Sequence, residues 1–206
     1  MSKASILVLY FSRKGQTEAL AREIARGVES ADAEALLRTV PPVAPVTEVA
    51  APPVPTSGPP YAELDELVRC DGLILGSPTR FGNMASALKH FLDTTSSLWL
   101  NGALEGKPAG VFTTSSSLHG GQETTLLSMA LPLIHHGMLF VGVPYTEKEL
   151  FDTRSGGSPY GATRITADWS EGFTADEKKI ARLLGHRVAT VAARLRDRGP
   201  RAAAGS

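Results

Sequence analysis

Short hydrophobic runs alternate with amphipathic stretches along most of the chain. Ser5–Phe11 is a continuous apolar run of strand length, which is typical of a strand covered on both faces. Thr17–Glu29 places its apolar and small residues three or four positions apart, which predicts a helix with one buried side. The same patterns predict strands at Glu34–Val40, Gly72–Gly76, Ala109–Thr113 and Met138–Val143, and helices at Tyr61–Val68, Met84–Thr94, Gln122–His136 and Thr174–Arg196. Five strands that alternate with helices predict parallel βαβ units, and therefore a doubly wound α/β fold.

Three segments interrupt this pattern. Residues 41–60 hold eight of the fourteen prolines, which disfavours regular secondary structure, so we predict a proline-rich loop. Residues 95–108 and 144–170 lack the periodicity of core elements, and we predict that they are insertions in a single domain spanning residues 1–198. Residues 199–206 are predicted to form a flexible tail.

Composition and charge exclude several classes of protein. The 206 residues include 21 Lys and Arg and 21 Asp and Glu, and zero net charge disfavours a protein that coats nucleic acid. The single cysteine, Cys70, cannot form an internal disulfide or a Cys-rich metal site, and we expect it to be buried. No apolar run reaches the ~18–20 residues that cross a bilayer, and no signal-peptide pattern is visible. We therefore expect a cytoplasmic protein without a metal, nucleic-acid or membrane partner.

The loop between the first strand and the first helix consists of Ser12, Arg13, Lys14, Gly15, Gln16 and Thr17. Its hydroxyls, amide and glycine can turn several backbone N–H groups toward one anion at a helix N-terminus, although a plain N-cap turn would have the same composition. The loop matches neither G-x-x-x-x-G-K-[ST] nor G-x-G-x-x-G, which disfavours a triphosphate site and a Rossmann dinucleotide site. A single terminal phosphate fits this loop.

The loop after the third strand, Ser77–Met84, offers an aromatic ring, a guanidinium and backbone N–H groups. Its central residues are Pro78, Thr79, Arg80, Phe81 and Gly82. These groups suit a flat heterocycle with carbonyl and ring-nitrogen acceptors, although Phe81 alone is also typical of a core. A phospho-receiver domain would need acidic residues at the ends of the first and third strands, where this chain has Ser12 and Ser77.

The loop after the fourth strand is rich in hydroxyls and glycine. It consists of Thr114, Ser115, Ser116, Ser117, Leu118, His119, Gly120 and Gly121. Its glycines allow close approach to a ligand, although a flexible connection would have the same composition. Because ligands of doubly wound folds bind at the carboxyl ends of the strands, the three loops together predict one site.

Motifs along nearly the whole chain resemble the WrbA family of NAD(P)H:quinone oxidoreductases, which belongs to the flavodoxin-like superfamily. The matching segments are YFSRKGQTEALA, GSPTRFGNM, FLDTTSSLW, GGQETTL, HHGM and GGSPYGAT. The resemblance implies a five-stranded parallel sheet in the order 2-1-3-4-5 with helices on both faces, non-covalent FMN and a homotetramer. It also implies a two-electron, ping-pong transfer from NADH or NADPH to quinones, which become hydroquinones.

The resemblance also assigns roles to individual residues. Ser12–Thr17 would cradle the FMN phosphate, Pro78–Gly82 would hold the isoalloxazine, and Thr114–Gly120 would cover its other edge. His135 would lie beside the flavin as the catalytic residue, although a histidine at a helix C-terminus is also favoured by the helix dipole. Trp99 would border the substrate space of a neighbouring subunit, although a surface tryptophan would give the same sequence.

Three features depart from the family pattern. Lys14 occupies the place of a tyrosine that the family associates with the nicotinamide cofactor, and a lysine there could favour NADPH or pair with the FMN phosphate. The third loop reads SSSLHGG and is one residue longer than usual, so His119 has no counterpart. The segment 41–60 replaces a region that varies among relatives.

Two other functions compete with quinone reduction. A flavodoxin-type carrier would pass single electrons to docked protein partners, but such carriers are typically acidic around the flavin, whereas Arg13, Lys14 and Arg80 are cationic. A repressor-binding or DNA-binding protein is suggested by the family's original name, but the chain has no basic stripe or recognition-helix pattern.

Overall fold

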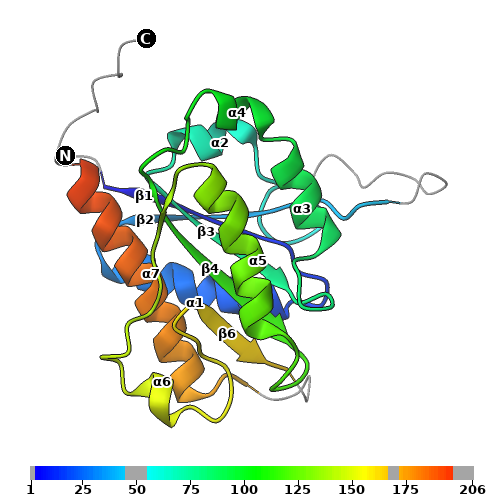
Figure 1. The fold of residues 1–206 in the computed structure, drawn as a ribbon, viewed down its shortest axis with the longest axis vertical. Coiled ribbons are helices and arrows are strands. Elements are labelled where there is room, and N and C mark those ends of the chain that lie inside the picture. The colour runs from blue at the N-terminus through cyan, green and yellow to red at the C-terminus, as the bar shows by residue number, and fades with distance from the viewer. Residues whose placement is uncertain (1–2, 45–54, 167–171, 197–206) are drawn as a thin grey trace.

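The computed structural model describes residues 3–44, 55–166 and 172–196, and a parallel six-stranded sheet forms its centre. The strands are β1 (Ser5–Tyr10), β2 (Glu34–Thr39), β3 (Gly72–Pro78), β4 (Pro108–Ser115), β5 (Leu139–Phe140) and β6 (Ala162–Ile165). Their order is β2-β1-β3-β4-β5, and β6 also pairs with β4 (Figure 1). Every pairing between these strands is parallel, which confirms the doubly wound fold and the expected strand order.

Two short strands fill the fifth position of the sheet, where one was predicted. β5 pairs with the first two residues of β4, whereas β6 pairs with the last four. The chain re-enters the sheet at Gly161, where a Cβ atom would lie 2.1 Å from the carbonyl oxygen of Val111, so only glycine allows this approach. The predicted strand Met138–Val143 is therefore too long, and residues 144–170, predicted to be an insertion without core elements, contribute β6 to the sheet.

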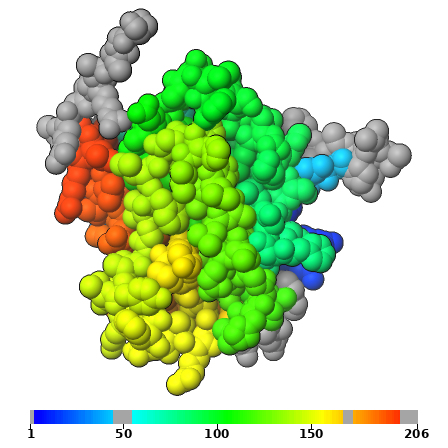
Figure 2. Space-filling model, in the orientation of Figure 1, coloured from blue at the N-terminus to red at the C-terminus, as the bar shows by residue number. Residues whose placement is uncertain are grey.

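Helices cover both faces of the sheet. They are α1 (Gln16–Ser30), α2 (Leu64–Arg69), α3 (Ser86–Asp93), α4 (Ser96–Leu100), α5 (Gln122–His135), α6 (Glu149–Asp152) and α7 (Ala175–Arg196). On one face Leu67 of α2, Leu88 of α3 and Leu133 of α5 are buried in a common cluster. α5 crosses the middle of the surface that Figure 2 shows. The short helices α4 and α6 lie in the two segments predicted as insertions, and the sequence pattern did not predict them.

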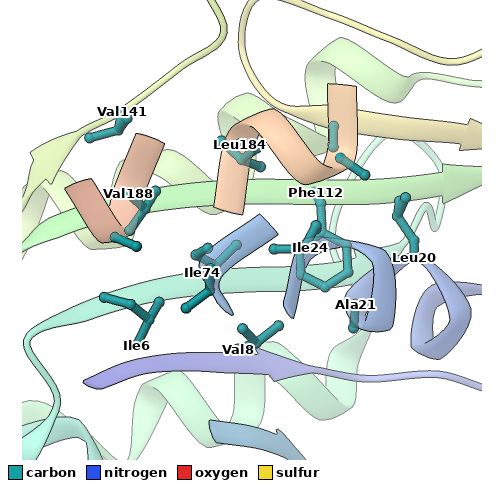
Figure 3. Packing of buried hydrophobic residues seen from close by; sticks show 14 of the residues in the cluster. Ile6, Val8, Leu20, Ala21, Ile24, Ile74, Phe112, Val141, Leu184 and Val188 are labelled. Atoms are coloured by element: carbon teal, nitrogen blue, oxygen red, sulfur yellow. The ribbon is translucent and has the colours of Figure 1, made fainter. Parts of the chain in front are cut away.

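α1 and α7 lie side by side over the opposite face of the sheet. Ile24 of α1 and Leu184 of α7 are fully buried and pack around Phe112 of β4 (Figure 3). α7 starts with a capping box, because the N–H of Glu177 donates to Thr174 Oγ1 and the N–H of Thr174 donates to Glu177 Oε2, both at 3.1 Å. The packing of Leu184 around Phe112 joins the C-terminal helix to the sheet that carries the loops.

The loops after β1, β3 and β4 meet at one edge of the sheet, because parallel strands all end on the same side. Cys70 is buried as predicted, and burial raises the pKa of its thiol to about 11, so it stays protonated at neutral pH. Within the described ranges, every helix is too short or too polar to cross a membrane. The predicted tail, residues 199–206, lies outside those ranges, as do residues 45–54 of the proline-rich segment.

Candidate functional site

The N-terminus of α1 follows β1 after a short turn, and no side chain in the described residues caps it. Gly15 is the N-cap residue, with φ of 80°, a left-handed conformation that glycine adopts without strain. A Cβ at Gly15 would meet no atom within 4 Å, so the requirement for glycine is conformational. The N–H groups of the first turn thus remain available to a ligand, and the helix dipole adds partial positive charge. An uncapped helix start of this kind suits an anion, which is the ligand predicted for this loop.

Hydroxyl groups from two loops gather beside this turn. Thr17 Oγ1 and Thr114 Oγ1 lie 3.0 Å apart, and both residues are buried. The hydroxyl of Ser12 is buried as well, yet it forms no hydrogen bond with any residue that the structure describes. A buried hydroxyl without a partner costs on the order of 1–3 kcal/mol. Ser12 is therefore placed to donate to an oxygen of a bound anion.

These groups line a cleft of about 260 Å³ at the carboxyl edge of the sheet. Its described lining consists of Ser12, Arg13, Lys14, Gln16, Thr17, Pro78, Thr79, Arg80, Thr114, Ser115, Ser116 and Thr166. All of these except Thr166 were predicted from the sequence as cofactor-binding residues. None of them is acidic and three are cationic, so the cleft favours an anionic ligand.

The loop after β3 ends in a tight turn that projects Phe81 into solvent. The N–H and carbonyl of Arg80 pair with the carbonyl and N–H of Asn83, at 2.8 and 3.0 Å. Phe81 and Gly82, between them, both have positive φ, 52° and 76°, as a type I′ turn requires. A bulky residue in this conformation is strained, and Phe81 is fully exposed. Its ring stands beside the cleft without lining it, and the strain marks it as a candidate ligand contact.

The loop after β4 is ordered by its own hydrogen bonds. Ser115 Oγ donates to the carbonyl of Ser117 at 2.7 Å, and the N–H of Gly120 donates to the same carbonyl at 3.2 Å. Thr79 Oγ1 donates to the carbonyl of Gly120 at 3.3 Å, which joins this loop to the one after β3. Leu118 and His119 are exposed, and neither they nor Ser117 and Gly120 line the cleft.

Thr166 is the lining residue that the sequence pattern missed. Its N–H and its hydroxyl both donate to the carbonyl of Ser115, at 2.8 and 3.0 Å. Thr166 follows directly after β6, so its position depends on the pairing of β6 with β4, which the local sequence does not indicate. In this region the sequence offered only the segment GGSPYGAT, residues 156–163, which matched the family pattern.

His135 and Trp99 lie at the opposite edge of the sheet from the cleft. α5 begins beside the third loop and runs away from it along the sheet (Figure 1). It ends at His135, and its 14 residues make it about 21 Å long. His135 and Trp99 line a separate hollow of about 400 Å³ between α4 and the end of α5. Within one chain, therefore, His135 does not lie beside the cleft that would hold the flavin.

The neighbouring His136 is held in one tautomer. Thr95 Oγ1 donates to the carbonyl of Leu92 at 2.7 Å, so it must accept the contact with His136 Nε2 at 2.9 Å. Burial and the adjacent His135 lower the pKa of His136. His136 thus stays neutral and fixes the end of α5 to α4.

No group of three or more His, Cys, Asp or Glu side chains is placed to hold a metal ion in the described ranges.

Comparison with known proteins adds an independent finding. A family model described as NADPH-dependent FMN reductase matches residues 4–147. Among solved structures, a flavodoxin, WrbA-like protein from Agrobacterium tumefaciens is 26% identical with a TM-score of 0.66, and the match covers 93% of this chain and 99% of that one. A flavodoxin from the domain Archaea is 20% identical (TM-score 0.59; 92% and 99% covered), and oxidised Flavodoxin 1 from Bacillus cereus is 17% identical (TM-score 0.59; 90% and 97% covered). The two flavodoxins are too distant to show more than the shared fold.

Proposed function

The chain belongs to the NADPH-dependent FMN reductase family, and from this premise we propose that it is an FMN-dependent NAD(P)H:quinone oxidoreductase of the WrbA type. Its cofactor is FMN and its electron donor is NAD(P)H. The observation that carries the quinone proposal is the cleft itself, whose described lining contains Arg13, Lys14 and Arg80 and no acid. An electron carrier that docks basic or polar protein surfaces would be expected to surround its flavin with acidic residues.

The residues of the cleft fit FMN. The first turn of α1 and the Ser12 hydroxyl, both without a side-chain partner in the described part of the chain, would hold its phosphate, and Thr17 and Thr114 lie beside them. Thr79 and Arg80 would face the ring system, with Phe81 at the mouth of the cleft. FMN supplies the two-electron acceptor and donor on which the reaction depends, and the protein binds, orients and tunes it.

The overall reaction converts NAD(P)H, a quinone and one proton into NAD(P)⁺ and a hydroquinone. In the ping-pong scheme the donor leaves before the quinone enters, so both use the same space in turn. Arg80 lines the cleft, and its guanidinium would stabilise negative charge that develops there. Because NAD(P)H is an intracellular reductant, we propose a cytoplasmic location, and we expect neither nucleic acid nor membrane as a partner.

We further propose that copies of the chain assemble, as a tetramer, so that His135 and Trp99 of one copy reach the cleft of another. α5 crosses the surface shown in Figure 2. It exposes Leu127, Leu131 and Ile134, whose spacing of four and three positions puts them on one side of the helix. His135 and Trp99 lie at the end of the same stripe. In this arrangement His135 would donate a hydrogen bond to the quinone oxygen, a role that it cannot have within its own chain.

The visible spectrum of the FMN-loaded protein tests this function. We expect anaerobic NADPH or NADH to bleach the flavin absorbance and benzoquinone to restore it, with parallel lines in a double-reciprocal plot at varied donor concentrations. A chemical titration that proceeds in two separate one-electron stages, without bleaching by either nicotinamide, would instead support the flavodoxin-type carrier. Sedimentation at micromolar concentration tests the tetramer separately.

A further inference from the structure

A second cavity adjoins the cleft on the side of α3. Its volume is about 720 Å³, and it shares Arg13 and Arg80 with the cleft. Lys89 of α3 lines this cavity but not the cleft. Of the loop Ser12–Thr17, only Arg13 reaches it, so the site for the FMN phosphate and this cavity are separate spaces with a common cationic wall.

The charges of this second cavity are not neutralised by its own lining. Among the described residues that line it, three are cationic and none is acidic. Arg13 forms no ion pair with any residue of the described ranges. Lys89 pairs with Asp93 at 2.5 Å, but their side chains are 53% and 60% exposed, and an ion pair of this kind contributes at most about 1 kcal/mol. A phosphate can therefore compete for Lys89.

The remaining lining is largely apolar. Phe11, Val43 and Met84 contribute to it, and they offer surfaces against which a flat base can pack. A third cavity, of about 610 Å³, also contains Arg13 but includes Glu18, whose carboxylate disfavours a phosphate. Of these two described cavities, the one beside α3 thus combines cations with apolar surface and lacks an acid.

We propose that this cavity binds the adenosine 2′-phosphate part of NADPH, with Lys89 on the 2′-phosphate and Arg13 and Arg80 along the pyrophosphate. The inference rests on the proposed function in that the nicotinamide of the donor must enter the cleft. The rest of the dinucleotide then has to extend into an adjoining space, and the shared wall of Arg13 and Arg80 marks the continuous path. Lys89 lines the cavity beyond the cleft, so it selects NADPH over NADH.

Calorimetric titration of the FMN-loaded protein with two fragments tests the proposal. Adenosine 2′,5′-bisphosphate carries the 2′-phosphate, whereas 5′-AMP lacks it. We expect the bisphosphate to bind about 10-fold more tightly than 5′-AMP, and Lys89→Gln to reduce its affinity about 3- to 10-fold with little effect on 5′-AMP. Asp93→Asn, which releases Lys89 from its ion pair, should raise the affinity about 2-fold.

The control variant is Lys178→Gln, which removes an exposed lysine from α7 on the other face of the sheet. It should change neither affinity, and FMN binding should be the same in all three variants. Equal affinity of the wild type for the two fragments, or an unchanged affinity in Lys89→Gln, would overturn the proposal. If the two fragments bind equally but the protein still reduces quinones, the proposed function stands and only the donor site is wrong. If the bisphosphate binds more tightly but no quinone is reduced, the donor site is supported and the proposed function is wrong.

Discussion

Buried hydroxyl groups at the two edges of the sheet differ in whether they are hydrogen-bonded. At the carboxyl edge, the Ser12 hydroxyl is buried without a partner in the described residues, beside a helix start that no side chain caps. At the amino edge, the Thr95 hydroxyl donates to Leu92 and accepts from His136, so both of its roles are satisfied. Since an unpartnered buried hydroxyl costs free energy, Ser12 is placed to meet a ligand, whereas the hydroxyl of Thr95 contributes to stability. In the Thr95 pair the atom without a partner among the described residues is His136 Nδ1.

This difference separates residues that would bind the cofactor from residues that hold the fold together. Substitutions at the edge that carries Ser12 should lower the affinity for FMN, while the free energy of unfolding of the cofactor-free protein stays nearly constant. Substitutions at the edge that carries Thr95 should lower the free energy of unfolding, while the affinity for FMN stays constant. Trp99 lies at the same edge as Thr95 but is half exposed. Its substitution should therefore change neither FMN affinity nor stability strongly, and should lower only quinone turnover at the cleft of a neighbouring subunit.

The largest effect is expected from Ser12→Ala. It removes a hydrogen bond to a charged phosphate, which contributes about 1.5–3 kcal/mol, so the Kd for FMN should rise about 10- to 100-fold. The melting temperature of the cofactor-free protein should stay the same or rise, because the variant also removes an unsatisfied hydroxyl. Quenching of FMN fluorescence measures the first quantity and thermal unfolding the second.

A matched control is Ser128→Ala, which removes a hydroxyl that bonds to the carbonyl of Thr125 within α5. FMN affinity should be unchanged in this variant. A cofactor-free Ser12→Ala protein that melts several degrees lower would show that the Ser12 hydroxyl has a structural partner.

Trp99→Ala should lower kcat/KM for a quinone about 10-fold, a loss of about 1.4 kcal/mol of transition-state stabilisation, while the Kd for FMN remains within about 2-fold. Its neighbour Leu100 is even more exposed and does not line the hollow with His135, so Leu100→Ala is the control. Steady-state kinetics with benzoquinone at saturating donor provide the measurement. If the variant loses FMN and activity in equal measure, Trp99 is structural and the two edges do not meet between subunits.

The contrast also shows which parts of the site local sequence can predict. The loop Ser12–Thr17 was predicted as a phosphate site because the features that favour an anion there, a glycine and hydroxyls at a helix start, are close together in the sequence. The structure places most of these residues on the cleft. Thr166 was missed because β6 is held by pairing with a strand about fifty positions earlier, and its four residues have little hydrophobic pattern of their own. The unusual backbone of Phe81 also lies beyond local patterns, since Phe-Gly is not a typical type I′ pair.

The position of His135 is a different case, because the predicted fold already contained the answer. A helix that follows a parallel strand returns across the sheet, so a helix of about 14 residues must end some 21 Å from the loop where it began. The family resemblance placed His135 beside the flavin. Only an assembly of several copies reconciles that role with the topology.

Thr95→Val should destabilise the protein by about 1–2 kcal/mol, because it leaves His136 Nε2 without its acceptor and removes the hydroxyl bond to the carbonyl of Leu92, which keeps the N–H of residue 95 as a donor. FMN affinity should not change, since Thr95 lies at the other edge from the cleft. Urea unfolding of the FMN-free protein gives the free energy of unfolding. Thr94→Val, an exposed neighbour whose hydroxyl bonds only to the carbonyl of Phe91, is the control and should cost less. A Thr95→Val protein as stable as wild type would remove the proposed division between the two edges.

The smallest effect concerns pH and distinguishes the edges by their titration. Folding lowers the pKa of His136 below its unfolded value of about 6.5, so the unfolded chain binds more protons in that range. Stability from a neutral His136 is therefore present above pH ~6.5 and is lost as the pH falls toward the lower folded pKa. His136→Gln keeps a donor for Thr95 without a titrating ring, so its melting temperature should fall less than that of wild type between pH ~7.5 and pH ~5.5.

The affinity for FMN should show no such difference between the two proteins, because the groups proposed to hold the phosphate at the Ser12 edge do not include the His136 ring. If the two melting temperatures shift in parallel with pH, His136 is not the group that titrates, and this explanation of the pH dependence is wrong.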